Sequence, residues 1–177
     1  MIVDLILVLL GILTAGILVT AVGFFILRVP FVPTPRHIAS AMIGMIEWKG
    51  NERVIDLGAG DGRLLEAVKK QYPSVTAIGC EIVPTVWLLG RVRAMLKRSG
   101  VQLHLRSLFH EDVSKADVVF LYLFPGVIEK LSEKFDRELK PGTMVVCQTF
   151  GLRNKKPEKE MRVPRFGSEV SVFLYRF

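Results

Sequence analysis

The sequence predicts an α/β protein with a doubly wound, mostly parallel seven-stranded sheet that ends in an antiparallel hairpin, preceded by one transmembrane helix. Three observations lead to this prediction. β-rich runs alternate with helical patterns from about residue 53, a glycine-rich turn joins the first strand to the first helix of that series, and an uncharged apolar run precedes them. Strands separated by helices of this length form right-handed crossovers, which make neighbouring strands parallel.

The uncharged run extends from Leu5 to Leu27. At 1.5 Å rise per residue, such a helix measures about 35 Å, enough to cross a hydrocarbon core of roughly 30 Å. A cleaved signal peptide needs a basic start and a shorter apolar core, whereas this chain opens Met-Ile-Val-Asp, with the acidic Asp4 before the run. Because Arg28 and Arg36 follow the run, the positive-inside rule predicts a single-pass membrane protein whose C-terminal domain faces the cytoplasm.

We expect three segments: an anchor at 1–28, a proline-rich segment with an amphipathic helix at 29–50, and a ligand-binding domain at 51–177. The prolines of PFVPTP at 30–35 favour extended backbone, and apolar residues near helical spacing predict a helix over 36–48. Past Gly151 the alternation gives way to a predicted antiparallel hairpin. The expected strands are 53–57, 75–80, 101–106, 117–123, 143–149, 160–165 and 169–177, with helices near 62–71, 85–98 and 127–139.

Composition limits the class of protein. With 50% hydrophobic and 23% charged residues, the chain is globular rather than disordered. The net charge of +7 comes largely from basic residues at 91–98 and 153–165. Such runs are usually solvated faces. Contact with anionic headgroups is a second interpretation and contact with nucleic acid a third, although no nucleic-acid partner is expected. Cys80 and Cys147 lie in apolar runs, which predicts buried free thiols and no metal site.

The glycine-rich turn, DLGAGDGR at 56–63, lies directly after a strand and before a helix. Gly58, Gly60 and Gly62 allow a sharp turn that brings backbone amides and a helix N-terminus against a ligand. Such a turn also occurs without a ligand. Glu81, however, ends the next strand, where nucleotide-binding sheets place a carboxylate for ribose hydroxyls.

Two acidic residues of the turn distinguish between ligands. The negative charges of Asp56 and Asp61 would oppose the pyrophosphate of NAD, but they suit the cationic amino and sulfonium groups of S-adenosyl-L-methionine. The turn also lacks the lysine of a nucleoside-triphosphate P-loop. The sequence therefore favours S-adenosyl-L-methionine as the cofactor.

The turn and Glu81 together resemble the first two motifs of seven-strand class I methyltransferases, which have a Rossmann-like fold. PFVPTP at 30–35, DLGAGDGR at 56–63 and LYLFPGV at 121–127 are similar to small archaeal protein lysine methyltransferases. They are also similar to the mitochondrial enzymes that methylate lysines of the adenine nucleotide translocase and of the ATP synthase c subunit. The resemblance covers roughly residues 29–177 and makes 51–177 an S-adenosylmethionine-binding domain.

The resemblance also implies roles for individual residues. Ser107 stands where the family usually has an Asp or Asn that contacts the adenine amino group, and Leu108 would form an apolar wall for the adenine. The remaining implied cofactor-binding residues are Asp56, Gly58, Gly60, Asp61 and Gly62, at the methionine end, and Glu81, at the ribose.

The acceptor amine is expected at the end of the fourth strand, where Tyr122, Phe124 and Pro125 are the candidate catalytic residues. DNA adenine methyltransferases have an Asp/Asn-Pro-Pro-aromatic motif there, which this chain lacks. A low-dielectric pocket lowers the pKa of a lysine, so these residues would act by shape and burial; sheet packing is the alternative role for the aromatic rings. Alignment and desolvation can suffice for methyl transfer, so a general base is not required.

These observations lead to the hypothesis of a membrane-anchored methyltransferase that N-methylates accessible lysine side chains of proteins at or near the bilayer. Two alternatives stay open. One is methylation of a small or lipid-like acceptor. The other is a catalytically silent scaffold that binds the cofactor at a membrane.

Overall fold

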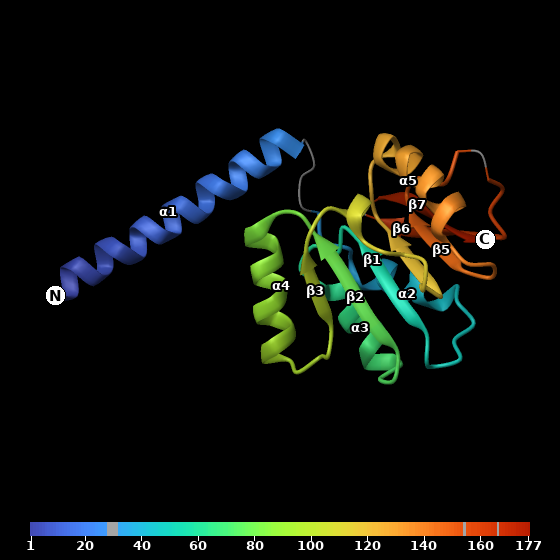
Figure 1. The fold of residues 1–177 in the computed structure, drawn as a ribbon, viewed down its shortest axis with the longest axis horizontal. Coiled ribbons are helices and arrows are strands. Elements are labelled where there is room, and N and C mark those ends of the chain that lie inside the picture. The colour runs from blue at the N-terminus through green and yellow to red at the C-terminus, as the bar shows by residue number, and fades with distance from the viewer. Residues whose placement is uncertain (28–31, 154, 166) are drawn as a thin grey trace.

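The core of the protein is a seven-stranded sheet with the strand order β3-β2-β1-β4-β5-β7-β6 (Figure 1). The computed structural model describes residues 1–27, 32–153, 155–165 and 167–177, and within α1 it does not describe the side chains at 13, 17 and 19–27. The strands are β1 Arg53–Leu57, β2 Thr76–Glu81, β3 Gln102–Leu105, β4 Val118–Leu121, β5 Met144–Gln148, β6 Lys159–Arg165 and β7 Ser168–Arg176. The helices are α1 Ile2–Leu27, α2 Arg36–Gly44, α3 Arg63–Gln71, α4 Pro84–Leu96 and α5 Pro125–Glu138, with a short 3-10 turn η1 at Leu108–His110.

The sheet is mixed, as predicted. Strands β3, β2, β1, β4 and β5 run parallel, and β7 enters antiparallel between β5 and β6. The chain proceeds from β1 outward to β2 and β3, then returns to β4 on the other side of β1. In sheets of this kind the crevice for ligands lies outside the carboxyl ends of the strands at such a reversal.

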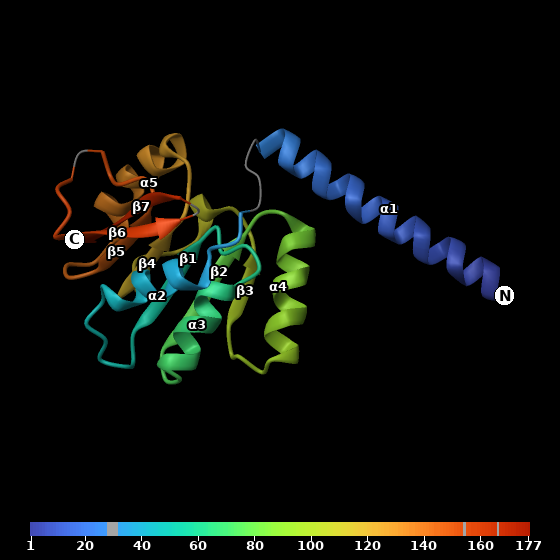
Figure 2. The ribbon, with the colours of Figure 1, turned by 180° about the vertical axis from the view of Figure 1, so that it is seen from behind.

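Helices cover both faces of the sheet, which makes the fold doubly wound (Figures 1 and 2). Helices α2 and α3 pack on one face through side chains such as Met42 and Leu65, and α4 adds Ala94 to the same cluster. Helix α5 packs on the other face through Leu131 and Phe135. Because both faces are covered, β4 and β5 are buried along their whole length, which explains their continuous apolar sequences.

Several elements are shorter than the sequence predicts, α2 and β4 among them. Helix α2 ends at Gly44 rather than at Trp48. The Trp48 indole instead donates a hydrogen bond of 2.9 Å to the Ile43 carbonyl, and its ring stacks on Tyr72 with centroids 4.6 Å apart. Strand β4 ends at Leu121, so the residues that follow it are free to line a cavity.

The N-terminal helix requires a correction. In both views α1 extends away from the sheet (Figures 1 and 2). Over the residues that the structure describes, no helix has both the length and the apolar character needed to cross a bilayer. A span takes about 20 consecutive apolar residues.

The single-pass localisation with a cytoplasmic domain, predicted from the apolar run, is therefore contradicted. The transmembrane helix expected at 1–28 and the bilayer expected as a partner are unsupported with it. Residues 28–31, which include part of the predicted proline-rich link, lie outside the described residues.

Candidate active site

The turn between β1 and α3 is held against β2 by its own backbone. The Gly58 and Ala59 amides donate hydrogen bonds of 3.0 and 2.9 Å to the Cys80 carbonyl. Gly58 has φ of +87°, and a Cβ there would lie 3.0 Å from the Leu123 side chain. Gly62, with φ of +75°, precedes the first residue of α3. Only glycine adopts these left-handed conformations without strain, so the spacing of the glycines follows from the path of the chain.

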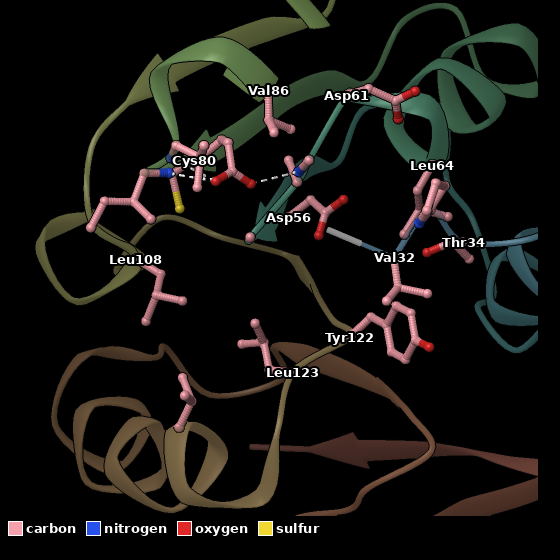
Figure 3. A pocket seen from close by; sticks show the side chains of 18 of the residues that line it. Val32, Thr34, Asp56, Asp61, Leu64, Cys80, Val86, Leu108, Tyr122 and Leu123 are labelled. Carbon is pink, nitrogen blue, oxygen red and sulfur yellow. Dashed lines mark hydrogen bonds between the residues drawn. The ribbon is translucent and has the colours of Figure 1, made fainter. Parts of the chain in front are cut away.

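A cavity of about 300 Å³ opens at the carboxyl ends of β1, β2, β4 and β5 (Figure 3). Nine of the eleven residues predicted for the site line it, whereas Gly62 and Pro125 do not. Gly62 is instead the N-cap residue of α3, and Pro125 is the first residue of α5. The predicted residues at the wall are Asp56, Gly58, Gly60, Asp61, Glu81, Ser107, Leu108, Tyr122 and Phe124.

Asp56 is a buried acid at the end of β1. Its residue is 5% exposed, and no described residue donates a hydrogen bond to its carboxylate. Burial, and then the negative charges of Glu81 and Asp61, raise the pKa of Asp56 to about 7. A carboxylate held in this way would be stabilised by a cation placed in the cavity.

Glu81 connects the turn to the loop after β2. One of its oxygens accepts hydrogen bonds of 2.8 Å from the Ile82 and Val83 amides, and the other accepts one of 3.1 Å from the Gly60 amide. An ionised carboxylate has about four acceptor positions. The described amides use three of them, which leaves capacity for a hydroxyl group in the cavity.

The sequence suggested that the Asp61 carboxylate faces the cationic groups of the cofactor, but in the structure two arginines bind it. Its carboxylate binds the Arg63 guanidinium at 2.7 Å and that of Arg93 at 3.2 Å. Burial opposes ionisation, but the hydrogen bonds from Arg63 and the charges of Arg63 and Arg93 outweigh it and lower the pKa of Asp61. Asp61 is therefore a neutralised anion that fixes the turn against α4, and Asp56 is the acid left available to a cationic ligand.

The wall opposite Asp56 is formed by the segment after β3 (Figure 3). Ser107 precedes η1, and its hydroxyl accepts a hydrogen bond of 3.4 Å from the Phe109 amide. Leu108 and Phe109 add apolar surface to the same wall. A polar group beside a flat apolar surface is suited to an aromatic base.

Tyr122 and Phe124 lie at the end of β4. The Tyr122 hydroxyl accepts a hydrogen bond of 2.9 Å from the Arg165 guanidinium, which also lies 5.9 Å from the centre of the tyrosine ring. Arg165 ends β6, so the C-terminal hairpin brings a positive charge to this end of the cavity. Phe124 is 45% exposed, so it stands at the mouth rather than in the core.

Comparison with known proteins identifies the family. The family model described as the ANTKMT methyltransferase domain matches residues 56–159. A protein-lysine N-methyltransferase of Saccharolobus islandicus is 32% identical over 85% of this chain and 95% of its own length. This chain belongs to the ANTKMT methyltransferase family.

The chain is also similar to a second curated lysine methyltransferase and to a solved methyltransferase structure. The mouse (Mus musculus) adenine nucleotide translocase lysine N-methyltransferase is 30% identical over 74% of this chain, which spans 57% of the mouse protein. A crystal structure of an RNA methyltransferase from Salinibacter ruber in complex with S-adenosyl-L-homocysteine superposes with a TM-score of 0.75. It is 30% identical and covers 82% of this chain and 93% of its own. The chain is thus an S-adenosyl-L-methionine-dependent methyltransferase, as the sequence predicts.

The cavity of this ANTKMT-family chain fits that cofactor. The unpaired carboxylate of Asp56 suits a cationic amino group, and the free acceptor capacity of Glu81 suits ribose hydroxyls. Both lie on the wall that the glycine turn forms.

Sequence reasoning missed the contribution of β5. Thr149 and Phe150, which follow this strand, line the cavity, as do Val32 and Thr34 before α2. The carboxyl ends of all the parallel strands border such a site, so the position of residues 149 and 150 could have indicated their role. For Val32 and Thr34 the only signal was that they belong to the proline-rich segment at 30–35.

Proposed function

We propose that this chain transfers the methyl group of S-adenosyl-L-methionine to the side-chain nitrogen of lysine in protein substrates. The observation that carries the proposal is the match to the protein-lysine N-methyltransferase of Saccharolobus islandicus, which spans 95% of that relative. Residues 51–177 would form the catalytic domain. The segment at 29–50 would complete it, since Val32 and Thr34 wall the end of the cavity near Tyr122 (Figure 3).

Within this proposal, the two ends of the cavity have different tasks. Asp56 would pair with the amino group of the cofactor, and Glu81 would accept hydrogen bonds from its ribose. Ser107 and Leu108 would contact the adenine. When bound, the cofactor supplies a methyl group activated by a sulfonium.

The acceptor lysine would enter past Phe124 and Phe150, which are 45% and 39% exposed. Aromatic rings at the mouth can pack against the methylene groups of a lysine side chain. The protonated ammonium form of the acceptor lysine would be disfavoured inside the cavity for two reasons. Burial removes its hydration, and the Arg165 guanidinium repels it. Both effects lower the pKa of the lysine and increase the fraction of neutral amine.

The neutral amine can then react without a protein base. Its lone pair forms the new bond to the methyl carbon while the electron pair of the carbon–sulfur bond passes to sulfur. The methylated nitrogen carries a positive charge and later releases a proton to water. Tyr122, fixed by Arg165, would hold the acceptor in line, and alignment of this kind can supply much of the rate enhancement.

A second candidate is methylation of RNA. It is favoured by the similarity to the Salinibacter ruber RNA methyltransferase and by the net charge of +7.

One labelling experiment tests both candidates. The purified chain is incubated with cofactor carrying a tritiated methyl group, in parallel with protein, RNA and lipid fractions of a cell extract. We expect label in protein that is recovered as methyl-lysine after acid hydrolysis, and no label with Glu81→Ala. Label confined to RNA or to lipid would refute the lysine proposal.

A further inference from the structure

Two neighbouring polar side chains at the carboxyl end of β5 lack hydrogen-bond partners anywhere in the described part of the chain. Both carboxamide atoms of Gln148 are buried and unpaired, and so is Oγ1 of Thr149. The Gln148 residue is fully buried. Nearly all buried polar groups in native proteins are paired, so a group that is not calls for an explanation such as a ligand.

The backbone at Thr149 is also unusual. Thr149 has φ of +69°, in the left-handed region that a β-branched residue rarely adopts. The Phe150 amide donates a hydrogen bond of 2.8 Å to the Gln148 carbonyl, which closes a three-residue turn around Thr149. A turn of this kind with positive φ is rare and strained, and strain of this sort clusters at sites that bind ligands.

Thr149 lies at the acceptor end of the cavity, whereas Gln148, the residue before it, is buried and does not line the cavity. Thr149 and Phe150 line the cavity, with Tyr122 in the same wall. Leu121, the last residue of β4, pairs with Cys147, and Tyr122 and Gln148 are the residues that follow these two in the chain. Glu81 lies across β1 from them, because β2 and β4 pair with opposite edges of β1.

We propose that the end of β5 binds the acceptor amine, with Thr149 Oγ1 accepting one of its N–H groups and the unpaired carboxamide oxygen of the neighbouring Gln148 offering a second acceptor. The inference rests on the proposed lysine methylation. Neither oxygen takes a proton from the amine at neutral pH. Hydrogen bonds from the N–H groups to them leave the nitrogen lone pair directed elsewhere, toward the methyl group.

Thr149→Val is the main test, because valine keeps the shape and the backbone strain and removes only the hydroxyl. Thr149→Ser keeps the hydroxyl. Thr143→Val is the matched control directly before β5, where the buried hydroxyl donates a hydrogen bond of 2.9 Å to the Ala116 carbonyl. The acceptor is the protein labelled in the experiment above, purified, and the readouts are kcat/KM, affinity for S-adenosyl-L-homocysteine, and Tm.

We expect Thr149→Val to lower kcat/KM roughly three- to tenfold, the effect of one hydrogen bond, without lowering Tm or affinity for S-adenosyl-L-homocysteine. Thr149→Ser should stay near the wild type. Thr143→Val should lower Tm and leave kcat/KM unchanged. Gln148→Met should keep or raise Tm, because it removes an unpaired buried amide, and should lower kcat/KM.

Two results would overturn the inference while lysine methylation stands. One is an unchanged kcat/KM in both Thr149→Val and Gln148→Met. The other is a parallel loss of affinity for S-adenosyl-L-homocysteine, which would assign these groups to the cofactor. If the wild-type chain labels no lysine, the proposed function fails and the inference fails with it.

Discussion

Replacing Asp56 by asparagine removes a buried acid whose ionisation the apo-protein opposes. The pKa of Asp56 rises from 3.8 in the unfolded chain to about 7 in the folded one, through burial and the charges of Glu81 and Asp61. Between these two values the folded state binds more protons than the unfolded state, so stability falls as pH rises. At about 1.36 kcal/mol per pKa unit, this single group costs roughly 4 kcal/mol of unfolding free energy by pH 8.

We therefore expect Asp56→Asn to unfold at higher urea concentration than the wild type at pH 8. The difference between their unfolding midpoints should shrink toward zero near pH 4. Asparagine has nearly the same shape, so packing should not contribute. A difference that stays constant between pH 4 and pH 8 would refute the assignment of a strained, buried acid.

The same substitution should remove the pH dependence of cofactor binding. In the wild type, affinity for S-adenosyl-L-homocysteine should fall about tenfold between pH 8 and pH 6, because Asp56 must be ionised to pair with the amino group. In Asp56→Asn the affinity should be low at both pH values, and the tenfold fall caused by protonation of Asp56 should be absent. Titration calorimetry at both pH values measures this, and a wild-type affinity that is equal at pH 6 and pH 8 would contradict it.

Three further predictions concern the cavity walls and the core. Glu81→Gln should weaken S-adenosyl-L-homocysteine binding about 10- to 100-fold, because charge-assisted hydrogen bonds to the ribose are lost, and unchanged affinity would exclude that role. Gly79→Ala should lower the unfolding free energy by about 1–3 kcal/mol in urea titrations, since its Cβ would lie 2.5 Å from the nearest side-chain atom; Gly126→Ala, with open space around it, is the control. Burial raises the pKa values of Cys80 and Cys147 to about 12, so iodoacetamide should label them at pH 8 only after unfolding, and rapid labelling of the native chain would disprove their burial.

The sheet was predictable because its signals are local. Alternating β-rich and helical runs gave the parallel strands, and Phe166-Gly167-Ser168 separated the two strands of the hairpin in the sequence. The insertion of β7 between β5 and β6 could not be derived in this way. It depends on pairing between distant segments, such as Val146 with Leu174, which no local pattern encodes.

The cofactor side of the candidate site was predictable because it depends on residue types with specific structural roles. Glycines with positive φ and an acid that ends a strand mark the cofactor side of the cavity. The salt bridges of Asp61 could not be foreseen, because Arg93 comes from the next helix and its distance from the turn depends on packing. The strained turn at Thr149 has no sequence signal at all, since glycine or asparagine would be the ordinary residue there.

The place of β7 in the sheet has a consequence for biosynthesis. Residues 53–148 contain every parallel strand, so they can begin to assemble as soon as they leave the ribosome. Until residues 168–176 have also been made, however, β5 is an open edge able to pair with other nascent chains. The Thr149 amide likewise has no partner before then, because its hydrogen bond goes to the Ser171 carbonyl. A chain stalled shortly before β7 should therefore be prone to aggregate and to depend on chaperones, whereas one that has made β7 should not.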